Sequence, residues 1–146
     1  MLTQRSLADD PSARCVVDYS LARRATLSAV RIGRLRRAEA CDAQTYLRRA
    51  ARYHGLPTDR SCPMCTTSTP MTDVLYAFGE SLRPAGNGRA RARKELLELA
   101  AVHPEISVFV VEVCLDCGWN YLTMSLVLGT GERLVRRGRT TSGSRG

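Results

Sequence analysis

The sequence predicts an α+β fold: an N-terminal helical bundle of two or three helices, followed by a three-stranded antiparallel ribbon with a helical insertion. Two observations lead to this prediction. In the first third of the chain, apolar residues recur with the period of an α-helix. Three later segments are rich in β-branched and aromatic residues, and two Cys-x-x-Cys turns lie at their ends. A chain of 146 residues suits one domain or two small ones.

The N-terminal part divides into an arm and a helical region. Residues 1–14 are polar and show no periodicity, so we expect a flexible arm there. Residues 15–57 form an Arg-rich helical region, in which residues 16–32 follow a helical period that Gly33 ends. Residues 36–54 are interpreted as one or two more helices, because apolar residues, Tyr46 and Tyr53 among them, continue the helical spacing until Gly55 and Pro57 end it. A helix-turn-helix is one interpretation of this region, and a solvated basic face is the simpler one.

The ribbon is predicted to occupy residues 58–129. Its three strands have the dense β-branched and aromatic composition of buried strands, and we expect them at residues 71–79, 106–114 and 121–128. The helical pattern of residues 89–103 ends before Pro104, so this helix is an insertion between the first two strands. Residues 130–146 are rich in Gly, Ser, Thr and Arg and are predicted to form a disordered basic tail.

Four cysteines form the two Cys-x-x-Cys motifs, at Cys62, Cys65, Cys114 and Cys117. Each motif places two thiolates on one tight turn, and two such turns supply four sulfurs for tetrahedral Zn²⁺. Four thiolates leave no coordination position open for water, so we expect one structural zinc ion and interpret residues 58–129 as a zinc ribbon. The alternatives are a cluster of reduced buried thiols, an iron ion in place of zinc, and a disulfide redox pair.

The remaining reactive residue types do not combine into a catalytic site. No set of nucleophile, base and orienting residue is evident, so we expect neither an enzyme nor a small-molecule substrate. Cys15 and Cys41 lie outside both motifs and are interpreted as isolated thiols, while His54 and His103 end predicted helices, where the helix dipole favours them. The chain shows no secretory signal and no apolar run long enough to span a bilayer. We therefore expect a cytoplasmic protein with no membrane partner and with reduced thiols.

The positive charge is unevenly distributed. Against 14 acidic residues the chain has 22 basic ones, a net charge of +8. Residues 1–60 have a net charge of +6, residues 61–131 of −2 and residues 132–146 of +4. An anionic partner such as nucleic acid should therefore contact the helical half and the tail. The expected contact residues are Arg23, Arg24, Arg31, Arg34, Arg36, Arg37, Arg133, Arg136 and Arg137. Trp119 could stack on a base, although a core position in a small sheet is the favoured interpretation.

Three functions fit these observations. The leading hypothesis is a non-enzymatic zinc protein that acts as an accessory factor, binding nucleic acid or a transcription or translation machine such as RNA polymerase or the ribosome. The first alternative is a protein–protein interaction adaptor in which zinc only stabilises the scaffold. The second is a thiol redox switch, in which an oxidant links the cysteines and releases zinc.

Several segments together resemble a known family. They are Cys41-Asp42-Ala43, the CPMC motif of residues 62–65, the V-x-Y-x-F-G pattern of residues 74–79 and the VEVCLDCGWN segment of residues 111–120. In combination they resemble an uncharacterised actinobacterial family of short zinc-ribbon proteins, catalogued as a domain of unknown function. The resemblance extends over residues 16–129, and the family pattern has His where this chain has Tyr121. It implies a four-thiolate metal site at the two Cys-x-x-Cys motifs, but no reaction and no named partner.

Overall fold

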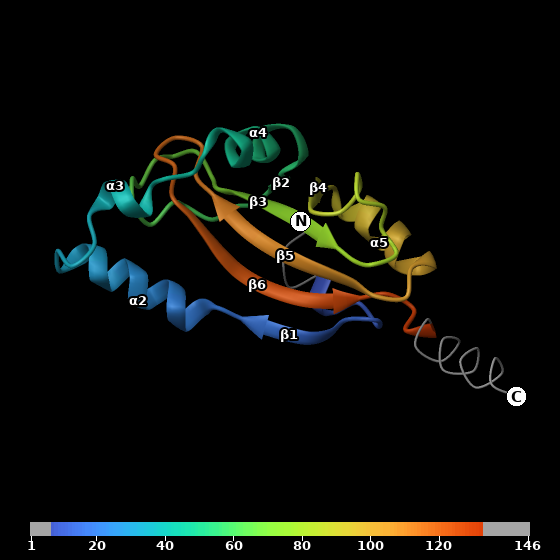
Figure 1. The fold of residues 1–146 in the computed structure, drawn as a ribbon. Coiled ribbons are helices and arrows are strands. Elements are labelled where there is room, and N and C mark those ends of the chain that lie inside the picture. The colour runs from blue at the N-terminus through green and yellow to red at the C-terminus, as the bar shows by residue number, and fades with distance from the viewer. Residues whose placement is uncertain (1–6, 133–146) are drawn as a thin grey trace, which may run out of the picture.

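A single antiparallel sheet organises the protein, as a computed structural model describing residues 7–132 shows (Figure 1). This mixed α+β fold has a six-stranded sheet with the order β1-β6-β5-β3-β2, and β4 also pairs with β3. The strands are β1 (Arg14–Asp18), β2 (Leu56–Pro57), β3 (Thr72–Phe78), β4 (Arg89–Arg91), β5 (Ile106–Val113) and β6 (Asn120–Leu128). The helices are α2 (Ser20–Arg31), α3 (Arg37–Ala40), α4 (Thr45–His54) and α5 (Arg93–Val102). Within residues 7–132, no helix combines the length and the apolar character that crossing a membrane requires.

The two faces of the sheet pack against different helices. Neighbouring side chains along a strand point to opposite faces. In β3, Leu75 accordingly lies in one cluster with Leu96 of α5, whereas Val74 lies in another with Ala50 and Ala51 of α4. The helices α4 and α5 thus cover opposite faces of the same strand, and β3 is buried on both sides over most of its length.

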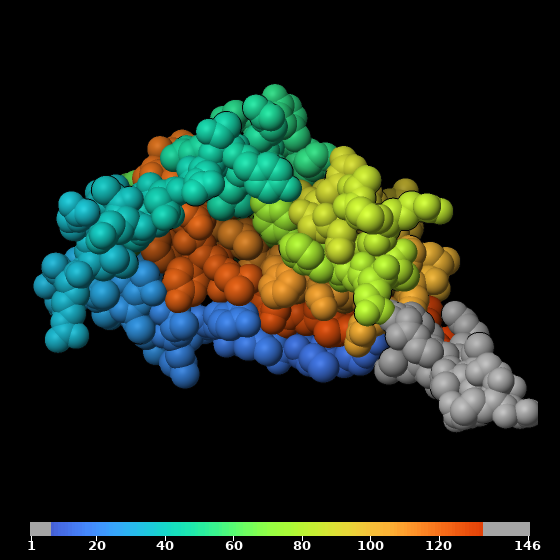
Figure 2. Space-filling view, in the orientation of Figure 1, coloured from blue at the N-terminus to red at the C-terminus, as the bar shows by residue number. Residues whose placement is uncertain are grey.

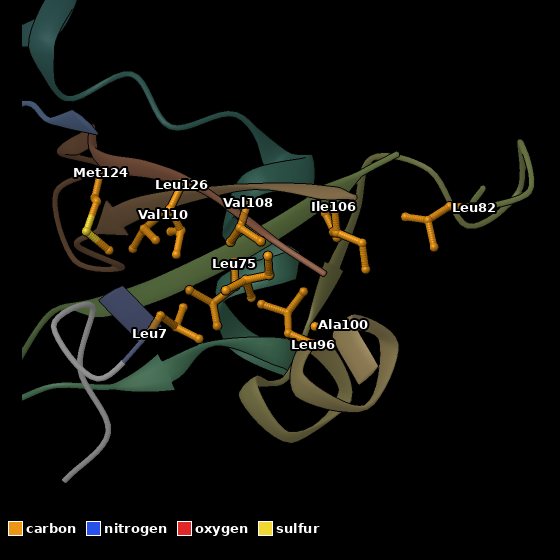
Figure 3. Packing of buried hydrophobic residues seen from close by; sticks show 12 residues of the cluster. Leu7, Leu75, Leu82, Leu96, Ala100, Ile106, Val108, Val110, Met124 and Leu126 are labelled. Atoms are coloured by element: carbon orange, nitrogen blue, oxygen red, sulfur yellow. The ribbon is translucent and has the colours of Figure 1, made fainter. Parts of the chain in front are cut away.

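The larger cluster, which we call the main core, lies between α5 and strands β3, β5 and β6 (Figure 3). Its buried side chains come from the centres of these elements: Leu7, Leu75, Ala77, Leu82, Leu96, Ala100, Ile106, Val108, Val110, Met124, Leu126 and Leu128. Each fully buried large aliphatic side chain stabilises a fold by roughly 1.5–3 kcal/mol. The main core therefore supplies a large share of the stability without any help from a metal.

The N-terminal arm is more ordered than its composition indicates. Leu7 has no exposed surface and lies in the main core, and Arg14 begins β1. Between them, the Asp10 carboxylate accepts hydrogen bonds from the backbone N–H and the hydroxyl of Ser12. The prediction of a flexible arm over residues 1–14 is therefore wrong for residues 7–14. A single apolar residue in a polar segment carries no periodicity, which is why the sequence pattern did not reveal this anchor.

The N-terminal helical bundle is not confirmed. The helix predicted at residues 16–32 begins only at Ser20, because Val16 and Val17 belong to strand β1, which pairs with β6. β-branched residues suit an extended edge strand, and pairing with β6 outweighs the helical period that they share with the residues after them. The later helices divide into α3 and α4, and α4 contacts β3 and β4 of the sheet.

The ribbon is part of a larger sheet than predicted. The three predicted strands are β3, β5 and β6, and they are neighbours in the sheet, but β1, β2 and β4 extend it to six strands. The inserted helix begins at Arg93 instead of residue 89, because Arg89–Arg91 pairs with β3 as β4. Strands of two, three and five residues are too short to show a clear alternating pattern. Of the predicted tail, only residues 130–132 are described, and residues 133–146 lie outside the described part.

Candidate metal centre

The two Cys-x-x-Cys turns meet at one end of the sheet. Cys62 and Cys65 lie in the segment before β3, and Cys114 and Cys117 lie in the turn that joins β5 to β6. The antiparallel pairing of β3 with β5 brings the two turns together, since Thr72 at the start of β3 lies opposite Val113 at the end of β5. All four Sγ atoms lie within 4.8 Å of one another, and none is in a disulfide.

Two of the distances between sulfurs match those expected for tetrahedral coordination of one ion. Tetrahedral geometry with metal–sulfur bonds of about 2.3 Å places neighbouring sulfurs about 3.8 Å apart. The Sγ atoms of Cys62 and Cys117 are 3.7 Å apart, and those of Cys65 and Cys114 are 3.6 Å apart. A disulfide would require about 2.05 Å. The four cysteines could therefore hold a metal ion, as the sequence motifs predicted.

Backbone conformation in the turns supports thiolate ligands. Gly118 has φ of +91°, and its N–H donates to the carbonyl of Cys114, which closes the second turn. The backbone N–H groups of Met64 and Trp119 donate to the sulfurs of Cys62 and Cys117, at 3.3 and 3.4 Å. Glycine adopts this positive φ without steric cost. The two donated hydrogen bonds stabilise negative charge on the sulfurs.

Burial and backbone hydrogen bonds shift the pKa values of three of the cysteine thiols in different directions. Desolvation raises the pKa of the Cys62 and Cys117 thiols, whereas a hydrogen bond from the backbone of Thr67 lowers the pKa of the Cys65 thiol. A metal ion must displace the protons of its thiol ligands, so its apparent affinity falls as the pH falls. In a buried four-sulfur site, a divalent cation also offsets the charge that desolvation disfavours.

A buried charged cluster, which we call the Glu112 network, lies directly beside the second turn. Trp119 has no exposed surface, and its indole Nε1–H donates to Oε2 of Glu112 at 2.8 Å. The same oxygen accepts from Nε of Arg23 at 2.6 Å, which ties α2 to β5. Arg60 completes the network, with Nη2 at 3.6 Å from Glu112 Oε1 and at 2.6 Å from Asp73 Oδ1. The buried carboxylate of Glu112 thus fixes the position of Trp119, which directly follows Gly118 in the second turn.

This network changes two of the predicted nucleic-acid contacts. The prediction that Trp119 stacks on a base is wrong, because its ring is buried and stacks on Tyr121 at 5.7 Å between ring centroids. Arg23 is already paired with Glu112 and lies over the Trp119 ring. A small sheet buries a large aromatic side chain of this kind in its core, and a buried ring cannot stack on a ligand.

The other predicted arginines in the described part lie on the surface of α2, α3 and the segment between them. Their side chains are exposed, and they are Arg24, Arg31, Arg34, Arg36 and Arg37. Arg31 donates to the hydroxyl of Ser28, and Arg36 forms a loose ion pair with Glu39 at 3.6 Å. The predicted contacts at Arg133, Arg136 and Arg137 lie outside the described residues.

The two cysteines outside the motifs have different environments. Cys15 is exposed on β1, where its φ of +54° coincides with an irregularity in the pairing of β1 with β6. Cys41 follows α3, packs against the four-cysteine cluster, and its thiol interacts with that of Cys117. A fifth sulfur thus lies at the edge of the metal centre, which the spacing of the cysteines along the chain did not reveal.

Sequence reasoning also missed the surface of α4. Tyr46, Arg49 and Tyr53 are exposed on this helix, and the spacings of three and seven residues place them on one side of it. By their spacing alone, the two tyrosines continue the apolar pattern of a helix and resemble core residues. The side of α4 that faces the sheet has small side chains, Ala50 and Ala51, and these two alanines are the sequence feature that distinguishes the buried side from the tyrosine side.

Known relatives of the chain share most of its length. A family profile described as "Family of unknown function (DUF5318)" matches residues 11–142. Uncharacterized proteins of Mycobacterium bovis and Mycobacterium tuberculosis are 45% identical over 129 residues, which is 88% of this chain and 92% of theirs. No solved structure matches the chain. The resemblance to an uncharacterised actinobacterial family is confirmed.

Proposed function

Because the chain belongs to the DUF5318 family, whose function is unknown, we propose a function from its own residues. We propose that it is a non-enzymatic cytoplasmic protein with one structural zinc ion, which binds nucleic acid through its basic helical half. The observation that carries the proposal is the cluster of four cysteine sulfurs within 4.8 Å, next to helices whose arginines face solvent.

The donor set favours zinc. Sulfur ligands exclude Mg²⁺ and Ca²⁺, which prefer oxygen, and select zinc or iron among the common metals. A closed four-thiolate tetrahedron is typical of structural zinc sites, whereas catalytic sites keep a position for water. The ion would therefore hold the turns of the sheet together and take no part in a reaction.

The basic surface would contact phosphate. Residues 1–60 contain twelve arginines and six acidic residues. Among the arginines of α2, only Arg23 forms an ion pair with a buried acid in the part of the chain that the structure describes. Guanidinium groups bind phosphate oxygens in a bidentate manner, which favours arginine for nucleic-acid contacts. Such contacts position a protein on the backbone without reading sequence.

The proposal predicts a strong salt dependence. Binding of a fluorescent DNA or RNA duplex, measured by anisotropy, should weaken as salt rises, because each neutralised phosphate releases counterions. The triple variant Arg24→Ala, Arg34→Ala, Arg37→Ala should reduce the slope of log K against log salt by up to about three. The matched triple with lysine retains the charge and should retain the slope.

Binding that does not respond to salt, or no binding to any DNA or RNA, would contradict the proposal. Stoichiometric capture of one protein after nuclease treatment would favour an adaptor instead.

The packing of Cys41 against the cluster that contains the four cysteines supports a second candidate function, a redox-sensitive zinc site. Hydrogen peroxide would take two electrons from the Cys41 thiol and the Cys117 thiolate, forming one S–S bond. The Cys41 proton and one proton from solvent complete two waters, and the loss of one ligand would release zinc. Zinc release, followed with a chromogenic chelator, should then be faster in the wild type than in Cys41→Ser. Cys15→Ser is the matched control and should behave as the wild type does. Equal release rates in all three proteins would exclude the switch.

A further inference from the structure

A shallow groove runs between α4 and β4, on the face of the sheet opposite α5. It has a volume of about 280 Å³, and Tyr46, Arg49, Tyr53, His54 and Arg89 contribute its larger side chains. The two elements are in contact, and Figure 2 shows the surface of α4 beside that of the segment around β4 at the top of the molecule. The groove lies apart from the metal centre and shares no residue with it.

Two exposed tyrosines mark the groove. Tyr46 is 62% exposed and Tyr53 is 70% exposed, which is unusual for large aromatic side chains of a small protein. They are seven residues apart on one helix, so about 10 Å of helix rise separates them on the same side. A single base is too small to contact both rings, whereas successive nucleotides about 3.4 Å apart extend over this length.

The Tyr46 ring is held in place before any ligand binds. It stacks on the ring of Tyr76 of β3, with centroids 6.4 Å apart and an angle of 20° between the planes. Burial, with a smaller contribution from Tyr46, raises the pKa of Tyr76 to about 12, so this supporting ring stays neutral. An aromatic ring fixed from below loses little conformational entropy when another ring stacks on it.

The charged side chains of the groove are all of one sign. Arg49 and Arg89 line it, and none of the lining residues that the structure describes is acidic. Within residues 7–132, neither arginine forms an ion pair, in contrast to Arg91 next to them, which pairs with Glu95 at 2.9 Å. The groove therefore offers positive charge that no carboxylate of the described chain neutralises, and an anionic occupant complements it.

We propose that this groove binds single-stranded nucleic acid, with bases stacked on Tyr46 and Tyr53 and phosphates paired with Arg49 and Arg89. The inference rests on the proposed nucleic-acid function and assigns it a second surface. Aromatic rings with interleaved cations are the pattern by which proteins hold single strands, because every unpaired base has a π-face. In a duplex the bases are stacked on each other and cannot reach these rings.

The test compares single-stranded and duplex ligands on the full, zinc-loaded chain. Anisotropy of a fluorescent oligouridine should show that Tyr53→Ala weakens binding by roughly 5- to 150-fold, the range for loss of one stacked base. Binding of a duplex of the same length should not change. Tyr53→Phe keeps the ring and should bind like the wild type. Leu21→Ala, an equally exposed truncation outside the groove, is the matched control.

The outcomes separate this inference from the proposed function. If Tyr53→Ala leaves the oligouridine affinity unchanged while duplex binding stays salt-dependent, the groove assignment is wrong and the proposed function stands. Equal weakening of both ligands would also overturn the groove assignment, because stacking acts only on unpaired bases. Absence of binding to any nucleic acid would overturn both. Tyr53-dependent binding of an acidic peptide in place of oligouridine would show that the groove is a protein-binding site.

Discussion

Cys114→Ser is expected to lose zinc and to unfold the end of the sheet that holds the metal centre. Cys114 is buried and directly follows β5, and a serine oxygen is a poor substitute for a thiolate on a soft ion. Apparent zinc binding is worth on the order of 10–16 kcal/mol in small zinc domains, so its loss outweighs a typical core truncation. Circular dichroism melts and zinc assays should show a lower Tm with less than one zinc per chain, as should a chelator added to the wild type.

The effect of zinc loss should be local as well as large. The main core contains no cysteine, whereas a second cluster, with Met71 and Trp119 among its members, surrounds the four sulfurs. Hydrogen exchange should therefore accelerate first in the two turns and later in β3 and β5. Cys15→Ser is the matched control, because it removes an exposed thiol and should leave zinc content and Tm unchanged. Melts that do not change after zinc is removed would show that the four cysteines have no structural metal.

Glu112→Ala should destabilise the protein by about 3–5 kcal/mol, the cost of removing one partner of a buried ion pair. The substitution leaves the partly exposed guanidinium of Arg23 and the buried indole N–H of Trp119 without their shared acceptor. Urea unfolding at saturating zinc measures the loss of free energy separately from metal occupancy.

Two further variants define the origin of this effect. Glu112→Gln keeps the shape and one acceptor oxygen but no charge, so it should fall between the wild type and Glu112→Ala. Glu95→Ala removes an exposed partner of Arg91 and should cost less than about 1 kcal/mol. If Glu112→Ala is as mild as Glu95→Ala, the Glu112 network contributes specificity of packing and not stability.

The metal centre was predictable because its signal is local. Each Cys-x-x-Cys motif encodes its own turn, and the strands on either side, β3, β5 and β6, have the composition of buried strands. Their positions needed no knowledge of the rest of the chain, so the sequence predicted the clustering of the four cysteines and the three central strands with nearly correct bounds. A four-sulfur site accepts zinc or iron, so the pattern of cysteines alone does not identify the metal.

The rest depends on contacts between distant segments. The Glu112 network joins Arg23 of α2 to Glu112, 89 positions away, and the register of β3 with β5 places Asp73 opposite Glu112. Nothing near Glu112 in the sequence indicates that Arg23 will neutralise it. In the same way, Val16 and Val17 fit a helix by their spacing and become a strand only because β6 offers an unpaired edge. The exposed tyrosines of α4 have the spacing of core residues, and only the buried alanines show which side faces the sheet.

The pairing of β1 with β6 also determines when the protein can be completed during synthesis. Arg14 lies opposite Val127, so the first strand has no partner until the last strand has left the ribosome. The cysteines of the second turn are synthesised some fifty residues after those of the first. A metal ion that binds the first two thiols early therefore lacks its other two sulfur ligands until the second turn is made. Until then, Val16 and Val17 belong to an unpaired segment that another chain could add to. Emergence of β6 from the ribosome therefore gives β1 its partner and completes the described sheet.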